Sequence, residues 1–292
     1  MRAKWKILLL IACFLWAISF IATKVALRST PPLTVASLRL VVAALFFLGW
    51  CLVRRTAIRT GGVSWWAELL LLSVVGMGHY AVQTIGLQYT TASNASLYAV
   101  TGPVTIVLLG ALFLKERITG RKAVGVILAI AGVLTVMGLD TLLKFQFQAH
   151  LWGDLLVLAS LVMWGAFTVF GKKMTDQLGA FTFTTVTTTL GAIWMIPVGW
   201  TELAQRGMTL SHIDAAAWWA IVFLGAACGF LATLLYFMAL RHTESQKVGV
   251  YLYTVPPMTA VVAAFYLGET IGVNLILGSA LVFGGVYLTD RG

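Results

Sequence analysis

Two segments of the chain, residues 85–135 and 238–288, align with each other without a gap at a constant offset of 153. Tyr98 falls opposite Tyr251 in this alignment, so the chain contains an internal duplication. Hydrophobic residues make up 60% of the sequence and charged residues only 10%, whereas a soluble domain carries roughly 25% charged residues. A chain with so few charges does not cover a surface that faces water. The sequence therefore predicts two related halves that both lie in a membrane.

Ten apolar runs, each bounded by charge, proline or turn residues, predict membrane-spanning helices. A helix needs about 20 residues to cross the hydrocarbon core, and these runs are too long for the strands of a membrane barrel. Several of the loops between them are only a few residues long, which makes neighbouring helices antiparallel. The expected spans are 5–26, 34–53, 65–87, 92–113, 121–138, 152–172, 181–200, 215–239, 246–267 and 273–289.

The distribution of lysine and arginine predicts how the helices are oriented. Fifteen of the 20 such residues fall on segments that share the side of the N-terminus, four fall on the other side, and Arg39 lies within a span. Positive charge is typical of cytoplasmic loops, so both termini are expected in the cytoplasm. The loop 114–122 reads LKERITGRK, but its counterpart 267–275 reads LGETIGVNL and has lost every cation. Because five spans per half is an odd number, equivalent loops face opposite sides, and the halves are expected to be inverted.

We therefore predict an all-α integral membrane protein with ten transmembrane helices, arranged as two inverted five-helix repeats around a central cavity. The first repeat is expected at 1–138, a periplasmic linker at 139–151 and the second repeat at 152–292. The front parts of the repeats correspond at an offset of 148, which sets Trp16 opposite Trp164. An inverted duplication in a membrane is typical of carriers that open alternately to the two sides.

Motifs of enzymes and of nucleotide-driven pumps are missing from the sequence. It contains no HExxH, no Gly-x-x-x-x-Gly-Lys phosphate loop and no paired carboxylates within the spans. The net charge of +10 is scattered over the inner loops, where it suits the anionic lipids of the cytoplasmic leaflet rather than nucleic acid. We expect no enzyme activity, no catalytic residue, no cofactor, no metal and no nucleic-acid partner.

Polar side chains on the fourth and ninth spans predict a face that holds a polar solute. Asn94, Tyr98 and Thr101 follow one another at spacings of four and three, which places them on one helical face. Tyr251 and Thr254 occupy the matching positions of the ninth span. In the alternative interpretation, these hydroxyl groups satisfy one another between helices. The double occurrence of the pattern favours contact with a substrate.

Further candidates for the binding site lie on the first, third, sixth and eighth spans. His79 and Gln83 share one face of the third span, and Gln83 aligns with Tyr236 on the eighth. An imidazole within a membrane faces a wet cavity or a partner, so His79 binds substrate, carries a proton or makes a neutral structural hydrogen bond. Trp16 and Trp164 lie near the middle of their spans, where they line a cavity or pack in the core.

Arg39 is the only cation well within a span. A buried guanidinium needs an anion or several carbonyl groups as partners. Two roles stay open for this side chain: it recognises a carboxylate on a substrate, or it has a structural role and bonds the ends of helices.

An ordered set of residues runs through the first repeat: Trp16, Lys24, Pro32, Arg39, Pro103, the run Leu114–Arg117, Gly125 and Gly132. Together with the duplication, this set resembles the drug/metabolite transporter superfamily, EamA-type, over residues 5–289. The resemblance implies a basket of ten helices with both termini cytoplasmic and a central cavity built from spans 1, 3, 4, 6, 8 and 9. It also implies export of small metabolites, often amino acids. It places eight candidates on cavity-forming spans: Trp16, His79, Gln83, Asn94, Tyr98, Trp164, Tyr236 and Tyr251. Glu116 and Glu269 match a recurring acidic position after a helix, for which we expect a structural role.

The predicted function is a secondary transporter that exports small metabolites, with amino acids or related compounds leading, across the bacterial inner membrane by alternating access. The alternative is a multidrug exporter of lipophilic cations, which is disfavoured because a cation carrier is expected to need a carboxylate within the membrane. A lesser alternative is an intramembrane enzyme in which His79 acts with Ser73 or Ser96. Membrane lipids are expected partners. Proton coupling stays open, and so does the choice between monomer and homodimer.

Overall fold

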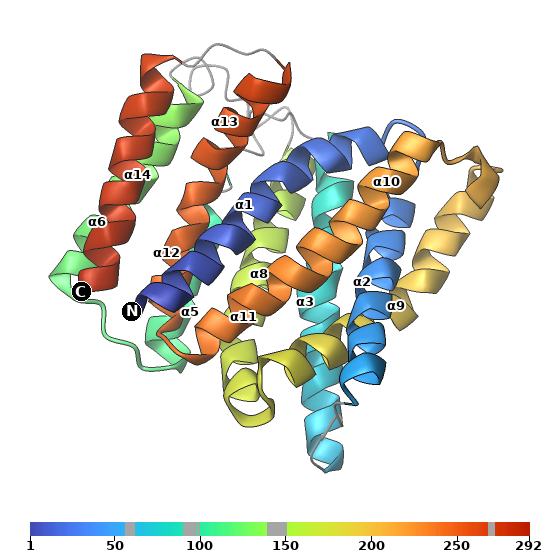
Figure 1. Cartoon of the computed structure of the whole chain (residues 1–292), viewed down its shortest axis with the longest axis horizontal. Coiled ribbons are helices and arrows are strands. Elements are labelled where there is room, and N and C mark those ends of the chain that lie inside the picture. The colour runs from blue at the N-terminus through green and yellow to red at the C-terminus, as the bar shows by residue number, and fades with distance from the viewer. Residues whose placement is uncertain (56–61, 90–97, 99, 139–150, 268–271) are drawn as a thin grey trace.

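The structure is a computed structural model that describes residues 1–55, 62–89, 98, 100–138, 151–267 and 272–292, and these residues form helices and connecting turns without a strand (Figure 1). Every predicted span overlaps a helix or a consecutive run of helices. The first half contains α1 (Ala3–Ala26), α2 (Pro32–Arg54), α3 (Val63–Tyr89), α5 (Thr101–Phe113) and α6 (Gly120–Met137). The second half contains α8 (Leu151–Leu178), α9 (Ala180–Gln205), α10 (Ala215–Phe223), η3 (Leu224–Ala232), α11 (Thr233–Arg241), α12 (Ser245–Tyr251), η4 (Leu252–Thr254), α13 (Val255–Leu267) and α14 (Val273–Arg291).

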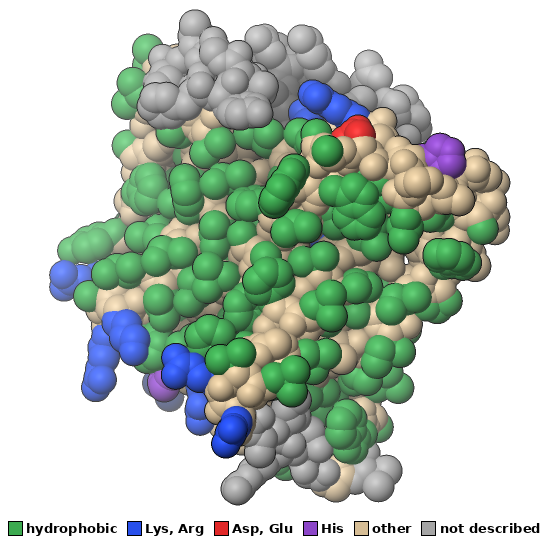
Figure 2. Space-filling view, turned by 45° about the vertical axis from the view of Figure 1, so that its right-hand side comes forward, with side chains coloured by type: hydrophobic (Ala, Val, Ile, Leu, Met, Phe, Trp, Pro, Cys, Tyr) green, Lys and Arg blue, Asp and Glu red, His purple; other side chains and the backbone are tan. Residues whose placement is uncertain are grey.

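The length and the surface of these helices suit a membrane. Within the described ranges, eight helices are long and apolar enough to cross one, and Thr101–Phe113 is a shorter apolar helix. Large apolar side chains cover the outside of the bundle, with Leu52 and Val53 each 80% exposed (Figure 2). So much exposed apolar surface is stable only against lipid. The prediction of an all-α integral membrane fold is confirmed.

Most of the Lys and Arg side chains on the face shown in Figure 2 gather at one end of the molecule. The N- and C-termini lie at this same end in Figure 1. The two termini are also joined by charge, because the Met1 ammonium group lies 3.5 Å from the Asp290 carboxylate and Lys6 pairs with the same carboxylate. The asymmetry of charge seen in the sequence is therefore an asymmetry between the two ends of the folded bundle.

Helices α6 and α14 pack together through glycine in a reciprocal pattern. A Cβ atom built on Gly132 would lie 2.7 Å from the Gly278 carbonyl oxygen, and one built on Gly125 would lie 2.6 Å from that of Gly285. In the sequence alignment Gly125 is equivalent to Gly278, and Gly132 to Gly285. The contacts thus cross between equivalent positions, which is the pattern that a two-fold axis produces in an antiparallel helix pair.

The ninth span is irregular near its middle, and proline explains why. The 3-10 turn η4 (Leu252–Thr254) separates α12 from α13, and Pro256 and Pro257 follow it. A proline lacks the amide hydrogen that would bond the carbonyl four residues earlier, and its ring clashes with that carbonyl. The carbonyls deprived in this way belong to Leu252 and Tyr253, which are both in the turn. Pro256 therefore interrupts the helix, as its position in the sequence predicts.

The eighth span contains a π-helical segment, η3 (Leu224–Ala232), that the sequence pattern does not predict. Gly225 and Gly229 bring this segment close to α2, because Cβ atoms there would lie 2.8 and 3.9 Å from the Arg39 carbonyl oxygen. The Thr233 hydroxyl donates a hydrogen bond to the Cys228 carbonyl at 3.1 Å and thereby satisfies a group that the widened turn exposes.

Glu116 ties the two halves together at the N-terminus of α12. Its carboxylate accepts hydrogen bonds from the Ser245 amide at 2.7 Å, the Ser245 hydroxyl at 2.9 Å and the Gln246 amide at 3.0 Å. The first amide groups of a helix have no partner within that helix, and a negative charge there also interacts favourably with the helix dipole. These contacts agree with the structural role expected for Glu116, whereas Glu269 lies outside the described residues.

The glycine contact predicts that Gly132→Ala destabilises the protein, because the new methyl group would meet the backbone nitrogen of Val282 at 2.6 Å and the helices would have to separate. We expect a cost of roughly 1–3 kcal/mol, visible as a lower midpoint in thermal unfolding of the purified protein in detergent. Gly49→Ala is the matched control, since nothing lies within 4 Å of a Cβ atom at that mid-helix position. Equal midpoints for the two variants would contradict the packing described.

Candidate functional site

Three aromatic rings from three helices meet in the core of the bundle. The rings of Trp16 on α1 and Trp164 on α8 are 5.5 Å apart between centroids and lie nearly perpendicular, at 88°. Tyr236 on α11 contacts both, with its ring centroid 5.3 Å from Trp16 and 5.6 Å from Trp164. Trp164 and Tyr236 are buried, and edge-to-face contacts of this kind stabilise aromatic pairs. We call these three residues together with His79 the ring cluster.

His79 joins the ring cluster from α3. Its ring centroid lies 5.1 Å from that of Trp164, and the residue is 7% exposed. Nδ1 is within hydrogen-bonding distance of the Gly76 carbonyl oxygen, which only accepts. The Nδ1 atom must therefore carry the proton. In the neutral ring Nε2 is then left as an acceptor.

A cation lies beside the ring cluster. The guanidinium carbon of Arg39 lies 4.0 Å from the centroid of the Tyr80 ring, and the Tyr80 ring is 3.9 Å from the His79 ring. The charge of Arg39 also acts on His79 and on Cys228 of η3. Arg39, Tyr80 and the ring cluster thus form a continuous series of contacts across α2, α3, α8, α1 and α11.

Equivalent positions of the two halves touch each other at two places. Trp16 and Trp164, which align at the offset of 148, are in direct contact. The Tyr253 hydroxyl donates a hydrogen bond at 3.0 Å to the carbonyl oxygen of Val100, the position equivalent to Tyr253 at the offset of 153. Positions related by a two-fold axis touch only where they lie close to that axis. The ring cluster therefore lies where an axis between the halves would pass.

The other predicted site residues are not in the ring cluster. Gln83 is half-buried and lies one helical turn along α3 from His79. Tyr98 interacts with the buried Asp154, which lies ten residues before Trp164 on α8 and so about 15 Å away along the helix. Asn94 lies outside the described residues.

Tyr251 on α12 is buried but makes no ring contact with the cluster in the part of the chain that the structure describes. Its carbonyl oxygen accepts hydrogen bonds from the Cys13 thiol at 3.4 Å and the Thr254 hydroxyl at 2.7 Å. The matched tyrosines of the fourth and ninth spans thus have separate surroundings. Tyr98 lies beside Asp154, whereas Tyr251 lies within reach of the Asp290 charge.

Sequence reasoning missed Tyr80 and Asp154. The position equivalent to Tyr80 is Thr233, so the duplication draws no attention to it. Asp154 is fully buried in the first turn of α8, near the end of a span. A useful signal is present for Asp154, because acidic residues are favoured in the first turn of a helix.

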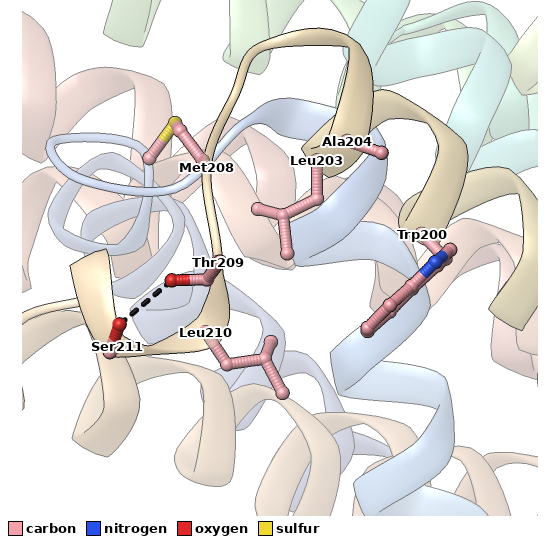
Figure 3. A pocket seen from close by; sticks show the side chains of 7 residues that line it. All are labelled: Trp200, Leu203, Ala204, Met208, Thr209, Leu210 and Ser211. Carbon is pink, nitrogen blue, oxygen red and sulfur yellow. Dashed lines mark hydrogen bonds between the residues drawn. The ribbon is translucent and has the colours of Figure 1, made fainter.

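A pocket of about 460 Å³ lies far from this chemistry, where α9 ends and the 3-10 turn η2 (Leu210–His212) follows (Figure 3). The Thr209 and Ser211 hydroxyls bond each other at 2.7 Å, and Trp200 is 64% exposed. None of the predicted site residues lines this pocket, so we do not assign it to the transported solute. Its lining consists of Trp200, Leu203, Ala204, Met208, Thr209, Leu210 and Ser211.

Among the described residues, no group of three or more His, Cys, Asp or Glu side chains is placed to hold a metal ion. Cys13 and Cys228 are buried free thiols, and each donates a weak hydrogen bond to a carbonyl on a neighbouring helix, at 3.4 Å to Tyr251 and 3.4 Å to Leu15 respectively.

Comparisons with known proteins match this chain to transporters. The model of the EamA-like transporter family matches residues 3–138 and 151–290. An uncharacterized transporter of Archaeoglobus fulgidus is 32% identical over 290 residues, which cover 99% of this chain and 98% of the relative. A probable terminal-alkyne amino-acid exporter of Streptantibioticus cattleyicolor is 28% identical, with 99% of this chain and 94% of the relative covered.

A probable amino-acid metabolite efflux pump of Salmonella typhimurium is 25% identical, with 100% of this chain and 96% of the relative covered. A solved crystal structure is similar in fold, with a TM-score of 0.84 over 100% of this chain and 98% of its own length at 19% identity.

The burial of Tyr236 predicts two distinct losses of stability. Tyr236→Phe removes only the hydroxyl, which lies 3.3 Å from the Thr168 hydroxyl, and we expect a cost of about 1 kcal/mol. Tyr236→Ala also removes the ring contacts, with an expected cost of about 3–5 kcal/mol. Thermal unfolding in detergent measures both, and Tyr287→Ala on the exposed side of α14 is the control. A similar loss for both Tyr236 variants would show that the rings contribute little.

Proposed function

Because the chain belongs to the EamA-like transporter family, we propose that it is a secondary transporter that moves small metabolites by alternating access. The proposed direction is export, across a bacterial cytoplasmic membrane. The proposed moving parts are the repeats 1–138 and 152–292, joined by the linker 139–151, most of which lies outside the described residues. The substrates that we propose are amino acids or related compounds.

The observation that carries this proposal is the contact between Trp16 and Trp164. Inverted-repeat carriers bind their solute near the middle of the membrane, where the repeats meet. A contact between equivalent residues marks this place, because such residues meet only beside the axis that relates the repeats. The ring cluster brings together four of the predicted site residues from α1, α3, α8 and α11 at that point. We propose it as the solute site, with Gln83, Asn94, Tyr98 and Tyr251 as further contributors.

The chemistry of the ring cluster favours amino acids with apolar or aromatic side chains. Ring faces of tryptophan and tyrosine bind apolar groups, and they also attract an ammonium group. Two relatives that match nearly the whole chain are described as an amino-acid exporter and an amino-acid metabolite efflux pump, which supports the same class.

The alternatives receive less support. The charged side chain beside the ring cluster is Arg39, whose positive charge would repel a lipophilic cation. An intramembrane enzyme would need His79 to activate a nucleophile. His79 instead binds the Gly76 carbonyl through Nδ1, and the Ser73 hydroxyl accepts a hydrogen bond from Trp194 at 3.4 Å. Ser96 lies outside the described residues.

We propose that the cation-rich end, which contains both termini, faces the cytoplasm, in agreement with the usual excess of positive charge on that side. The exposed apolar surface would then contact membrane lipids. For proton coupling we propose His79 as the proton site, since Nδ1 holds the proton of the neutral ring and no partner of Nε2 is found among the described residues. The choice between monomer and homodimer stays open.

Transport is expected to fail when either ring of the axial pair is removed. In liposomes that contain the purified protein, labelled L-phenylalanine or L-leucine should enter in exchange for the unlabelled solute inside. Trp16→Ala and Trp164→Ala should each slow this counterflow about tenfold or more, because each removes a buried aromatic contact. Trp219→Ala is the matched control, since Trp219 is 74% exposed on α10. Undiminished counterflow by both axial variants would remove the ring cluster as the site, and a comparison with and without a pH gradient tests proton coupling.

The proposed orientation gives a simple topological expectation. Green fluorescent protein fused after Gly292 should fluoresce and alkaline phosphatase fused there should be inactive, as expected for a cytoplasmic C-terminus. The reason is that the C-terminus shares the cation-rich end with the N-terminus. Paired fusions of alkaline phosphatase and of green fluorescent protein in a bacterial host measure this. High phosphatase activity with a dark fluorescent fusion would reverse the orientation.

A further inference from the structure

We infer that Arg39 is the group that binds the carboxylate of the transported solute, which specifies the substrate class as small carboxylates with an apolar portion. The inference rests on the proposed function and adds to it the chemical group that this chain selects. It starts from a charge on α2, within the bundle, that has no counter-ion among the described residues.

Arg39 lacks an anionic partner in the part of the chain that the structure describes. The ion pairs found there involve Asp290, Glu244, Asp176 and Glu202, and none of them includes Arg39. No side-chain hydrogen bond from Arg39 is found either, and its buried Nε atom has no acceptor. A guanidinium group offers five N–H donors, so its hydrogen-bonding capacity is almost entirely unused.

Glu202, an acidic residue that contacts α2, binds Thr34 rather than Arg39. The Glu202 carboxylate accepts hydrogen bonds from the Thr34 amide at 2.8 Å and the Thr34 hydroxyl at 3.1 Å, at the N-terminus of α2. Its other oxygen lies 3.9 Å from Arg206. Arg39 lies five residues further along α2, about 7.5 Å away along the helix. Among the described residues, Arg39 therefore makes no side-chain hydrogen bond to the end of a helix.

The position of Arg39 suits an incoming solute. The residue is only half-buried, so part of it is accessible, and the Tyr80 ring supports its guanidinium group from one side. Stacking on an aromatic ring leaves the edge of a guanidinium group, with its paired N–H donors, free to bind a carboxylate through two parallel hydrogen bonds.

The ring cluster supplies the other half of a binding site. From Arg39 the contacts run through Tyr80 to His79 and then to Trp164, with steps of 4.0, 3.9 and 5.1 Å. A solute whose carboxylate binds Arg39 would thus place its apolar portion toward the rings. The carboxamide of the same solute lacks the negative charge, so it would leave the Arg39 guanidinium group without an anion and should be rejected.

The test compares acids with their amides in liposomes that contain the full-length protein. Labelled L-phenylalanine and L-leucine, and the carboxamides of both, are measured in counterflow. Wild-type protein should move the acids and not the amides. Arg39→Gln should lose transport of the acids by roughly 30-fold or more, because it removes one partner of a desolvated charge pair. Arg39→Lys should still prefer the acids but bind them more weakly, since an ammonium group cannot form the two parallel hydrogen bonds of a guanidinium group.

Arg206→Gln provides the matched control, because it makes the same chemical change at an exposed arginine and should behave like wild type. Equal movement of acids and amides by wild-type protein, or an unchanged preference in folded Arg39→Gln, would overturn the assignment and leave the carrier function standing. If wild-type protein moves neither acid, the proposed function itself fails.

A second measurement covers the case in which Arg39→Gln does not fold. Wild-type protein is treated with phenylglyoxal, which modifies arginine, and the extent of reaction at Arg39 is read by mass spectrometry. L-Phenylalanine should protect Arg39 and its carboxamide should not, while Arg206 should react alike in both samples. Equal protection by the two compounds, or no reaction at Arg39 in the empty protein, would overturn the assignment.

Discussion

Hydrocarbon offers no hydrogen bonds, so each backbone amide and carbonyl in a membrane needs a partner within the protein. Regular helices meet this need along their length, and the ends and irregular turns require side chains. Glu116 supplies acceptors for the first amides of α12. Lys172 donates to the Leu240 carbonyl in the last turn of α11 at 2.7 Å and to the Thr243 carbonyl just beyond that helix at 2.8 Å. Glu116 and Lys172 thus satisfy backbone groups at helix ends, and Glu116 does so between the two halves.

The same constraint applies to charged side chains, so a charge without a partner in the protein indicates a place where a ligand can bind. On the face shown in Figure 2, most Lys and Arg side chains lie at one end of the bundle. Arg39 is different, because it lies against the half-buried Tyr80 ring and has neither an anion nor a carbonyl group as partner among the described residues. A cation without a partner among the described residues is a group that the carboxylate of a transported solute would neutralise.

Hydropathy was sufficient to predict the positions of the helices along the chain. Trp16 and Trp164 were paired by the alignment alone, and the structure brings their rings into contact. The π-helical segment was not predictable, because a glycine-rich apolar run reads the same in either helix type. Tyr80 was missed for a related reason, since its importance comes from Arg39 on another helix. Contacts between helices depend on rotation about each axis, which an apolar run without a polar face leaves undetermined.

The glycine contacts between α6 and α14 have a mechanical consequence. Backbone atoms meet there without side chains between them, so no rotamer change can take up a relative displacement. We therefore expect the pair, to which each repeat contributes one helix, to stay together and to act as the pivot when the repeats move. Any rocking that exposes the rings to one side and then to the other must bend or slide elsewhere, and the proline-interrupted ninth span and the π-helical eighth span are the segments with the irregular hydrogen bonding to allow it.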